Sequence, residues 1–346
     1  MINGAFKAHV RRTYGRRRSE RFAVVLFSWV VILLIVTSGA GSPSDWDAVS
    51  CCPSLNSDVW ESDSLAPGLY RRSHHFDELF GSRQYVNVLT VAPGSPGLEV
   101  GVEAARRFRR DWMTVSDFGQ RTDAIAAVNG GFAHGGAASS NSGIVKVDGE
   151  VISFLRKEPE ALRFVGSSAF GIDADGRWHF RDRDGDRWDK DWEDVEDALA
   201  AGHVLIRDGE VTQIVQNERF ASDREVNHAA RRHPRTAVCM TADSTVVLTT
   251  VDGRHEEAEG LTLEELSRLL HVFGCHEALN LDGGGSTTMW TLKYGVVNHP
   301  SDNEQFDAEG QRLLKTAVVV RYQHGSVLGG GGSTPLETKS PPDRRR

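Results

Sequence analysis

The sequence predicts an α+β fold: a β-rich single domain with a large mixed sheet, several hairpins and few helices. Three Asp-Gly pairs lie between alternating or apolar segments, and such pairs favour tight hairpin turns, whose central residues need positive φ. Several longer apolar runs are typical of strands buried on both faces. Only one segment combines clear helical periodicity with start and stop signals. The expected domain extends from residue 65 to residue 322.

The hairpin turns are expected at Asp148-Gly149, Asp175-Gly176 and Asp208-Gly209. Strands beside these turns are expected at Gly143–Val147, Val151–Phe154, Val204–Ile206 and Val211–Val215. Unbroken apolar runs predict further strands, buried on both faces, at Ile125–Val128, Val246–Val251, Ala278–Leu281 and Ala317–Arg321.

The clearest helix is expected at Leu263–Phe273. Thr262 and Glu265 have the spacing of a capping box at its start, and Gly274 is a typical stop. Apolar residues within it fall on one helical face. A second helix is expected around Glu193–Ala200.

The N-terminus has the order of an export signal. Arginines between residues 11 and 21 precede the apolar run Phe22–Val36, and the small residues Ser38 to Ala40 follow. Residues 1–40 are therefore predicted to be an export signal, or a membrane anchor through residues 22–40 if they stay uncleaved. The protein is expected to be secreted, or extracytoplasmic and membrane-anchored. Residues 41–64 are predicted to be a linker and residues 323–346 a disordered tail.

Charge and cysteine content narrow the class of protein. A net charge of −8 with no basic stripe in the body of the chain argues against nucleic-acid binding. The four cysteines, Cys51, Cys52, Cys239 and Cys275, suit an oxidising compartment without forming a dense disulfide framework. A Cys239–Cys275 bridge and a pair of buried free thiols remain alternative interpretations.

An apolar strand that ends in a polar residue and a run of glycines occurs twice. Asn129 is followed by Gly130 and Gly131, and Asp282 is followed by Gly283, Gly284, Gly285, Ser286 and Thr287. Glycines leave backbone N–H groups open to a ligand, and a strand end is a rigid support for a catalytic group. Tight turns with capping side chains would explain one such run, but three consecutive glycines cost conformational entropy that turn geometry alone does not justify.

Three further polar segments complete the candidate site. Arg235 and Thr236 follow Pro234, and a guanidinium matches two phosphate oxygens at once. The segment Val251–Arg254 is either a hairpin turn or a strand end that presents the carboxylate of Asp252 and the guanidinium of Arg254. Asn298 and Asp302 belong to a polar loop before the last strand.

In order and type these segments resemble the phosphodiester glycosidase family. The resemblance covers roughly residues 120–322 and rests on Asn129–Phe132, His233–Ala237, Val251–Arg254, Gly260–Leu266, Gly274-Cys275, Ala278–Thr287, Val297–Pro300 and Thr316–Arg321. Ala133 and Cys239 depart from the family pattern, which often has an aromatic residue and a glycine there. Neither departure removes a polar site residue.

The resemblance implies hydrolysis of a sugar 1-phosphodiester, or of a phosphate-linked glycan, at the glycosidic C–O bond, which releases sugar and a phosphomonoester. In this hypothesis Asp282 is the nucleophile or general base, and Asn129 orients a sugar hydroxyl or water. Asp252 and Asp302 are alternative candidates for a second carboxylate. Arg235 holds the phosphate, helped by the glycine N–H groups of residues 283–285. The other residues expected to bind substrate are Thr236, Asn280, Gly130, Gly131, Ser286, Thr287 and Asn298.

Two other classes of function compete with this hypothesis. A non-catalytic glycan-binding module of the cell wall would stack sugars on Trp178, Trp188 and Trp192. A metal-dependent phosphodiesterase would cut the P–O bond. Calcium is an alternative at the acidic stretch Asp182, Asp184, Asp186 and Asp189, but a solvated acidic loop is favoured because the full EF-hand spacing is absent. Otherwise no cofactor and no metal is expected, since the histidines lack zinc-ligand spacing.

Overall fold

The computed structural model describes residues 55, 59–133, 143–153, 164–183, 192–214 and 223–323. The chain divides into two units, 1–43 and 44–346, and all described residues belong to the second. The predicted export signal and most of the predicted tail lie outside the described residues. No helix in the described part of the chain is both long and apolar enough to cross a membrane.

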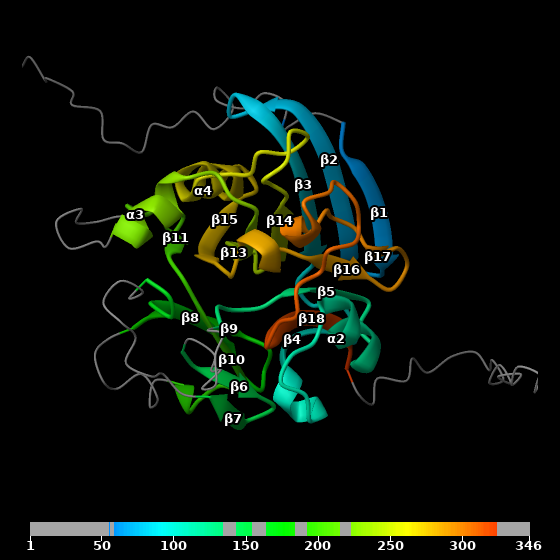
Figure 1. The fold of residues 1–346 in the computed structure, drawn as a ribbon. Coiled ribbons are helices and arrows are strands. Elements are labelled where there is room, and N and C mark those ends of the chain that lie inside the picture. Colours follow the sequence, from blue (N-terminus) through cyan, green and yellow to red (C-terminus); the bar gives the residue numbers. More distant parts are fainter. Residues whose placement is uncertain are drawn as a thin grey trace, which may run out of the picture. The chain divides into compact units, whose positions relative to one another are not determined.

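The largest sheet has eight strands and is covered on one face by two helices (Figure 1). Its order is β1 (Glu61–Ala66), β2 (Leu69–Leu79), β3 (Ser82–Val91), β14 (Val246–Val251), β13 (Arg235–Thr241), β15 (Cys275–Asn280), β11 (Val204–Arg207) and β12 (Glu210–Val211). The helices are α3 (Asp223–Ala230) and α4 (Leu263–Val272). The leucines of α4 pack against buried residues of β11, β13 and β15, which fixes this helix on the sheet.

Two five-stranded sheets complete the architecture. One has the order β7 (Glu150–Ser153), β6 (Val145–Val147), β10 (Asp197–Ala201), β8 (Ser168–Ile172) and β9 (Trp178–Asp182). The other has the order β17 (Gly295–Val296), β16 (Met289–Thr291), β5 (Ala126–Asn129), β18 (Thr316–Tyr322) and β4 (Leu98–Ala104), with α2 (Val115–Arg121) packed on it. Short 3-10 turns are η2 (Ala105–Phe108), η5 (Gly284–Ser286) and η6 (Ser301–Asn303).

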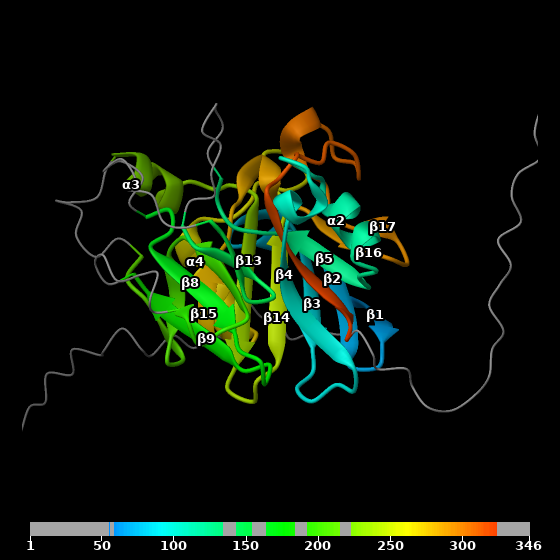
Figure 2. The same cartoon turned by 90° about the horizontal axis from the view of Figure 1, so that it is seen from below.

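The central core lies where the inner faces of the three sheets meet. Leu248 and Leu279 come from the eight-stranded sheet, Val128 and Val318 from the sheet of β5, and Phe170 from the sheet of β8. Figure 2 shows the strands of the three sheets converging on this region. Burial of these side chains stabilises the fold by roughly 25 cal/mol for each Å² of apolar surface removed from water.

The β-rich α+β class predicted from the sequence is confirmed. Two of the Asp-Gly pairs have positive φ at both residues, 47° and 76° at Asp148-Gly149 and 53° and 81° at Asp208-Gly209. The capping box of Thr262 and Glu265 is present at the start of α4. The sheets, however, are antiparallel instead of mixed: every strand pairing among the described residues is antiparallel, and short hairpins join many neighbours.

Other details of the prediction were wrong. The helix expected around Glu193–Ala200 is replaced by strand β10, whose five residues are all buried between β6 and β8. Its alanines favour a helix locally, but burial on both faces of a sheet overrides that preference. Strand β1 begins at Glu61, within the segment predicted to be a linker, so the folded domain starts earlier than residue 65.

Cys239 and Cys275 form a disulfide with a Cα–Cα distance of 5.8 Å. The bridge joins the end of β13 to the start of β15, which are neighbouring strands. Of the two interpretations left open by the sequence, the structure therefore has the bridge. Cys51 and Cys52 lie outside the described residues.

Candidate active site

Polar residues singled out from the sequence gather at one end of the sheets. Asn129 is the last residue of β5, and Asp282 follows shortly after the end of β15. The backbone N–H of Asp282 donates to the carbonyl oxygen of Gly130 at 3.2 Å, which joins the two glycine-containing loops. Arg235 begins β13 and is paired with Val251, the last residue of β14. Segments far apart in the sequence therefore meet at one edge.

Asn129 is fully buried and holds the two loops together. Its side-chain N–H groups donate to the backbone carbonyl oxygens of Asp282 at 2.7 Å and Gly130 at 3.4 Å. Its Oδ1 accepts from the Thr236 hydroxyl at 2.7 Å and from the backbone N–H of Thr288 at 3.1 Å. These bonds occupy the whole amide. Asn129 thus positions Asp282, and the expected contact with a sugar hydroxyl or water is not supported.

Asp282 is a partly buried carboxylate held by its own loop. Its Oδ1 accepts from the backbone N–H of Gly283 at 2.9 Å, and its Oδ2 accepts from the Ser286 hydroxyl at 2.7 Å. Burial raises the pKa of Asp282 to about 6, although these hydrogen bonds and the charges of Arg312 and Arg254 oppose the rise. The carboxylate is therefore mostly ionised at neutral pH and more basic than an ordinary aspartate.

The glycine loop, Gly283–Gly285, allows other groups of the protein to approach Asp282 closely. A Cβ on its first residue would lie 2.7 Å from the carbonyl oxygen of Pro234. A Cβ on its second residue would lie 2.7 Å from Nη2 of Arg254, and one on its third would lie 1.7 Å from Oδ1 of Asp302. The second residue also has a φ of +62°, which favours glycine. The protein's own groups, before any ligand, thus require bare backbone here.

Asp252 is buried and works through a histidine that the sequence analysis missed. Its Oδ2 lies 2.7 Å from Nδ1 of His299 and accepts from the backbone N–H of that residue at 3.0 Å. The Asn298 amide donates to Oδ1 of Asp252 at 2.9 Å and to the carbonyl oxygen of Thr287 at 3.1 Å. Burial raises the pKa of Asp252, and the bonds to His299 oppose that rise. The pair is therefore tied to the loop that carries Asp282.

His299 has the arrangement of a general acid or base. With Nδ1 directed at a carboxylate, its Nε2 is the nitrogen left to exchange a proton. The ring is 21% exposed and stacks on Phe306 with a centroid distance of 3.7 Å. The segment Val297–Pro300 was singled out from the sequence, but the pairing of His299 with Asp252 depends on contact between residues 47 apart in the chain.

Arg235 does not have the exposed position that a phosphate clamp requires. It is 1% exposed. Its Nε donates to the carbonyl oxygen of Leu261 at 2.7 Å, and its Nη2 donates to those of His228 at 2.7 Å and Arg231 at 2.8 Å. Burial, together with the nearby charge of Arg254, lowers the pKa of Arg235 to about 9. The prediction of direct phosphate binding is thus contradicted, because backbone carbonyls occupy the guanidinium.

Two other guanidiniums lie beside Asp282. Arg254 is exposed and close to the glycine loop, and among the described residues its side chain has no hydrogen bond or ion pair. Arg312 forms a bidentate pair with Asp302, with both N–O distances 2.7 Å. Asp302 is therefore neutralised by Arg312 and is not a free second carboxylate. The sequence had included Arg254 in a motif, whereas nothing local to Arg312 marked it.

The other residues predicted to bind substrate lie around Asp282, and most of them are buried. The buried ones are Thr236, Asn280, Ser286, Thr287 and Asn298. Gly130 and Gly131 lie against β18 and β10, where a Cβ would meet Thr316 at 2.4 Å and the carbonyl oxygen of Ala200 at 2.2 Å. The two glycines thus serve close packing between sheets, and the expected opening to a ligand is not supported at these positions.

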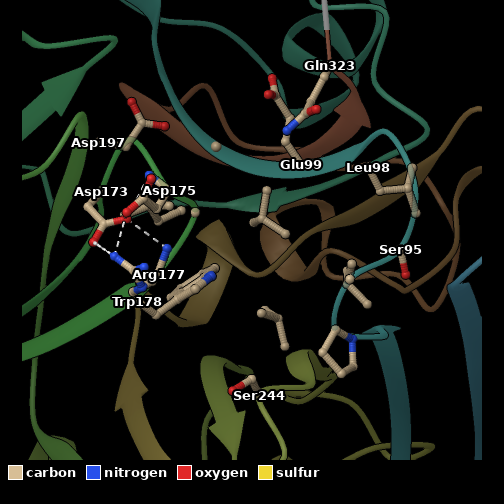
Figure 3. A pocket seen from close by; sticks show the side chains of 18 of the residues that line it. Ser95, Leu98, Glu99, Asp173, Asp175, Arg177, Trp178, Asp197, Ser244 and Gln323 are labelled. Carbon is tan, nitrogen blue, oxygen red and sulfur yellow. Dashed lines mark hydrogen bonds and ion pairs between the residues drawn. The ribbon is translucent and has the colours of Figure 1, made fainter. Parts of the chain in front are cut away.

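A cavity of about 830 Å³ lies at the opposite strand ends (Figure 3). Its lining includes Val246 and Leu98, which are the first residues of β14 and β4. Nη1 of Arg177 pairs with Oδ2 of Asp175 at 2.5 Å, and Oδ1 of Asp173 accepts from the backbone N–H groups of Asp175 and Arg177, both at 2.9 Å. This cavity is therefore separate from the site around Asp282.

The structure also bears on the alternative interpretations. Asp184, Asp186, Asp189 and Trp188 lie outside the described residues, and Asp182 pairs with Arg207 at 2.5 Å. Trp192 is 1% exposed and is not a surface platform, whereas Trp178 is half-buried and stacks on Phe170.

One group among the described residues has the spacing of a metal site: Asp208, His276 and Glu277. It lies at the β11–β12 turn and the start of β15, the opposite end of β15 from Asp282. Glu277 already accepts from Arg207 at 2.6 Å. This group is therefore no part of the site around Asp282.

The structure thus places a basic carboxylate, Asp282, beside the guanidiniums of Arg254 and Arg312 at the strand ends of a β-rich domain. The chain belongs to the phosphodiester glycosidase family, whose family model matches residues 122–321. A shorter match, 42% identical over 72 residues, is to the uncharacterized SPbeta prophage-derived protein YomE of Bacillus subtilis. It covers 20% of this chain and 11% of that protein.

Solved structures share the fold. The catalytic domain of zebrafish N-acetylglucosamine-1-phosphodiester alpha-N-acetylglucosaminidase, auto-inhibited by its pro-peptide, matches with a TM-score of 0.57 and 20% identity over 78% of this chain and 85% of that one. A hypothetical protein from Synechocystis matches with a TM-score of 0.58 and 13% identity over 78% and 64%. A protein of Burkholderia pseudomallei K96243 whose name describes it as exported matches with a TM-score of 0.52 and 16% identity over 71% and 75%.

Proposed function

We propose that the protein is an exported hydrolase that cleaves a sugar 1-phosphodiester at the glycosidic C–O bond. Family membership supports a phosphodiester glycosidase fold. The observation that carries the proposal is the Asp282 carboxylate, whose pKa is raised to about 6 and whose loop is flanked by Arg254 and Arg312. A basic carboxylate suits an oxocarbenium-like transition state, and guanidiniums suit the phosphate that leaves.

Arg254 is the principal phosphate ligand in this proposal. Its side chain lies beside the bare backbone of Gly284 and has no partner in the described part of the chain. Arg312 adds charge nearby while it stays paired with Asp302. Arg235 acts at longer range, since its buried positive charge is bound only to carbonyl groups and a neighbouring imidazole. The three arginines thus divide into two beside the glycine loop and one buried cation that supports them.

Cleavage needs an incoming water and a proton acceptor. The bond between the sugar carbon and the bridging oxygen breaks, and that oxygen leaves with the phosphate. Asp282 stabilises the positive charge at the sugar carbon, as nucleophile or general base, and water adds to the same carbon. His299, which Asp252 orients, accepts the proton that this water loses and passes it to the departing phosphate or to solvent. The second catalytic group is thus the imidazole, and Asp252 is a positioning residue.

Export is part of the proposal. The basic and apolar N-terminal order is typical of an export signal. The Cys239–Cys275 bridge is typical of an oxidising compartment. The substrate would then be a phosphate-linked glycan outside the cytoplasm.

The test is hydrolysis of UDP-N-acetylglucosamine in oxygen-18 water. We expect the label on the released sugar and none on the phosphate. Asp282→Asn and His299→Ala should each lower kcat by about 10²-fold or more. Label on the phosphate, or full activity of Asp282→Asn, would overturn the proposal. Chelator sensitivity with label on the phosphate would instead support a metal-dependent phosphodiesterase.

A further inference from the structure

A cluster of rings lies beside Asp282 on the face of the eight-stranded sheet that carries α3. Phe164 stacks on His203 with a centroid distance of 5.2 Å and on His228 with a centroid distance of 5.0 Å. Phe132 contacts Phe164 and His228 edge-on at 6.3 and 6.1 Å. Phe132 and His228 are partly exposed, so the cluster reaches the surface through these two rings. We call these four side chains the ring cluster.

Asn280 lies against the ring cluster with an amide that the described residues leave unused. It is 0% exposed, and neither its Oδ1 nor its Nδ2 makes a hydrogen bond within the part of the chain that the structure describes. A Cβ on Gly202 would lie 2.9 Å from the Phe132 ring and 3.4 Å from Nδ2 of Asn280, so ring and amide are neighbours. A buried amide without partners is costly, which indicates that it serves a ligand.

The rings offer more unused polar atoms. Neither ring nitrogen of His203, which is 6% exposed, makes a hydrogen bond to the described residues, although its Nε2 lies 3.4 Å from Oε1 of Glu225. Nδ1 of His228 is also buried without a hydrogen bond. Burial lowers the pKa of His228 to about 2, so this imidazole is neutral. A neutral imidazole such as that of His228 can both donate and accept a hydrogen bond.

Asp282 lies along the chain between Asn280 and the glycine loop, and the cation that the rings touch is itself buried, since Nη1 of Arg235 lies 3.4 Å from Nε2 of His228. Asn280 is two residues before Asp282, and Phe132 is two residues after Gly130, whose carbonyl oxygen accepts from the Asp282 backbone. The guanidinium of Arg254 is packed against the glycine loop that follows Asp282. A sugar 1-phosphodiester has a neutral polyol on one side of the scissile bond and an anion on the other.

We propose that the ring cluster and Asn280 form the subsite for the neutral sugar, and that Asn280 hydrogen-bonds a hydroxyl or amide substituent of that sugar. The inference rests on the proposed function, because it takes Asp282 as the point of cleavage. Aromatic and imidazole rings contact the C–H groups of the sugar, while the Asn280 amide donates and accepts once each. The phosphate lies on the side of Arg254.

The experiment measures binding of each half separately. N-acetylglucosamine, glucose, galactose and mannose are titrated as neutral probes, and UMP as the phosphate probe, by calorimetry or saturation-transfer NMR. Asn280→Leu should weaken the binding of the preferred sugar by about tenfold and leave UMP within about twofold, since only the hydrogen bonds to the sugar are lost. Arg254→Ala should do the reverse.

Thr249→Val is the matched control. Thr249 lies two strands from Asn280 in the same sheet, is 0% exposed and has a hydroxyl without a partner in the described chain. Thr249→Val should change neither the binding of the neutral sugar nor the binding of UMP. Asn280→Leu should also keep or raise Tm, because it removes buried polar atoms that have no partner in the described protein; an amide needed for folding would lower Tm.

Three results would overturn the subsite: no neutral sugar binds the wild type, Asn280→Leu binds sugar as well as the wild type, or it weakens sugar and UMP equally. The proposed hydrolysis is tested independently by the oxygen-18 label. Sugar binding that depends on Asn280 without turnover would refute the reaction alone, whereas turnover unaffected by Asn280→Leu would refute the subsite alone.

Discussion

The carboxylate at the centre of the site is expected to destabilise the fold. The pKa of Asp282 rises from 3.8 to about 6 because of burial. Since one pKa unit corresponds to about 1.4 kcal/mol, ionising Asp282 in the folded protein costs about 3 kcal/mol more than in the unfolded chain. Asp282→Asn removes that cost. It should therefore stabilise the protein by up to about 3 kcal/mol at pH 7 while it abolishes activity.

The difference in stability between wild type and Asp282→Asn should depend on pH. Between the unfolded pKa of 3.8 and the folded pKa of about 6, the folded state binds the proton more tightly, so wild-type stability falls as pH rises through this window. Below pH 3.8 both states are protonated and the difference between wild type and variant should vanish. Above about pH 6 the difference should be constant.

Urea unfolding of wild type and Asp282→Asn at a pH near 4 and at pH 7 measures the effect. The new amide keeps one acceptor for Gly283, and the Ser286 hydroxyl can reorient to accept, so lost hydrogen bonds should offset only part of the gain. Asp243→Asn, at a carboxyl whose pKa is lowered by the Thr241 hydroxyl, is a control that should not stabilise. A variant of equal or lower stability at pH 7, or a difference that does not shrink in acid, would refute the reasoning.

Three further predictions separate binding, catalysis and folding. Arg254→Ala should lower kcat/KM by about 10²-fold and leave Tm unchanged. Arg235→Ala should instead lower the free energy of unfolding by about 3 kcal/mol or more, because it leaves buried carbonyl groups unpaired. Equal Tm values for the two variants would contradict their assigned roles. His299→Ala should lower kcat more than it raises KM, measured across pH, and an unchanged pH–rate profile would remove His299 from proton transfer. The Cys239–Cys275 bridge joins residues separated by 36 positions. Its reduction should lower the free energy of unfolding by roughly 4 kcal/mol, with activity retained under native conditions. Identical denaturant midpoints with and without reductant would contradict this.

Most of the strands that local pattern predicted are present, because hairpin turns and helix caps depend on neighbouring residues. The turn at Asp148-Gly149 and the capping box at Thr262 depend on residues within a few positions of one another. The strand at Asp197–Ala201 was missed because its conformation depends on β6 and β8, which are distant in the chain. The antiparallel pairing of the described strands was likewise not predicted, because it depends on contacts between segments that are distant in the chain.

For the site, the sequence located the loops but not the direction of the side chains. It identified the segments that contain Asp282, Asp252 and Arg254, since glycines and strand ends are visible in sequence. It assigned the phosphate to Arg235 because residue type alone does not distinguish a guanidinium that faces solvent from one that is bound to carbonyls. His299 was missed because its role depends on a carboxylate 47 residues away.

The packing around the glycine loop explains why three consecutive glycines follow Asp282 in this chain. Each of its three residues faces a different neighbour: the Pro234 carbonyl, the Arg254 guanidinium and the Asp302 carboxylate, all closer than a Cβ would permit. The charge of Arg254 lowers the pKa of Asp282, and Asp302 holds Arg312, whose charge has the same effect. The Pro234 carbonyl anchors the loop to the start of β13. A side chain at any of the three positions would therefore disturb either charge placement or backbone packing. The loop brings groups from three separate segments around one carboxylate, and this convergence gives Asp282 its environment.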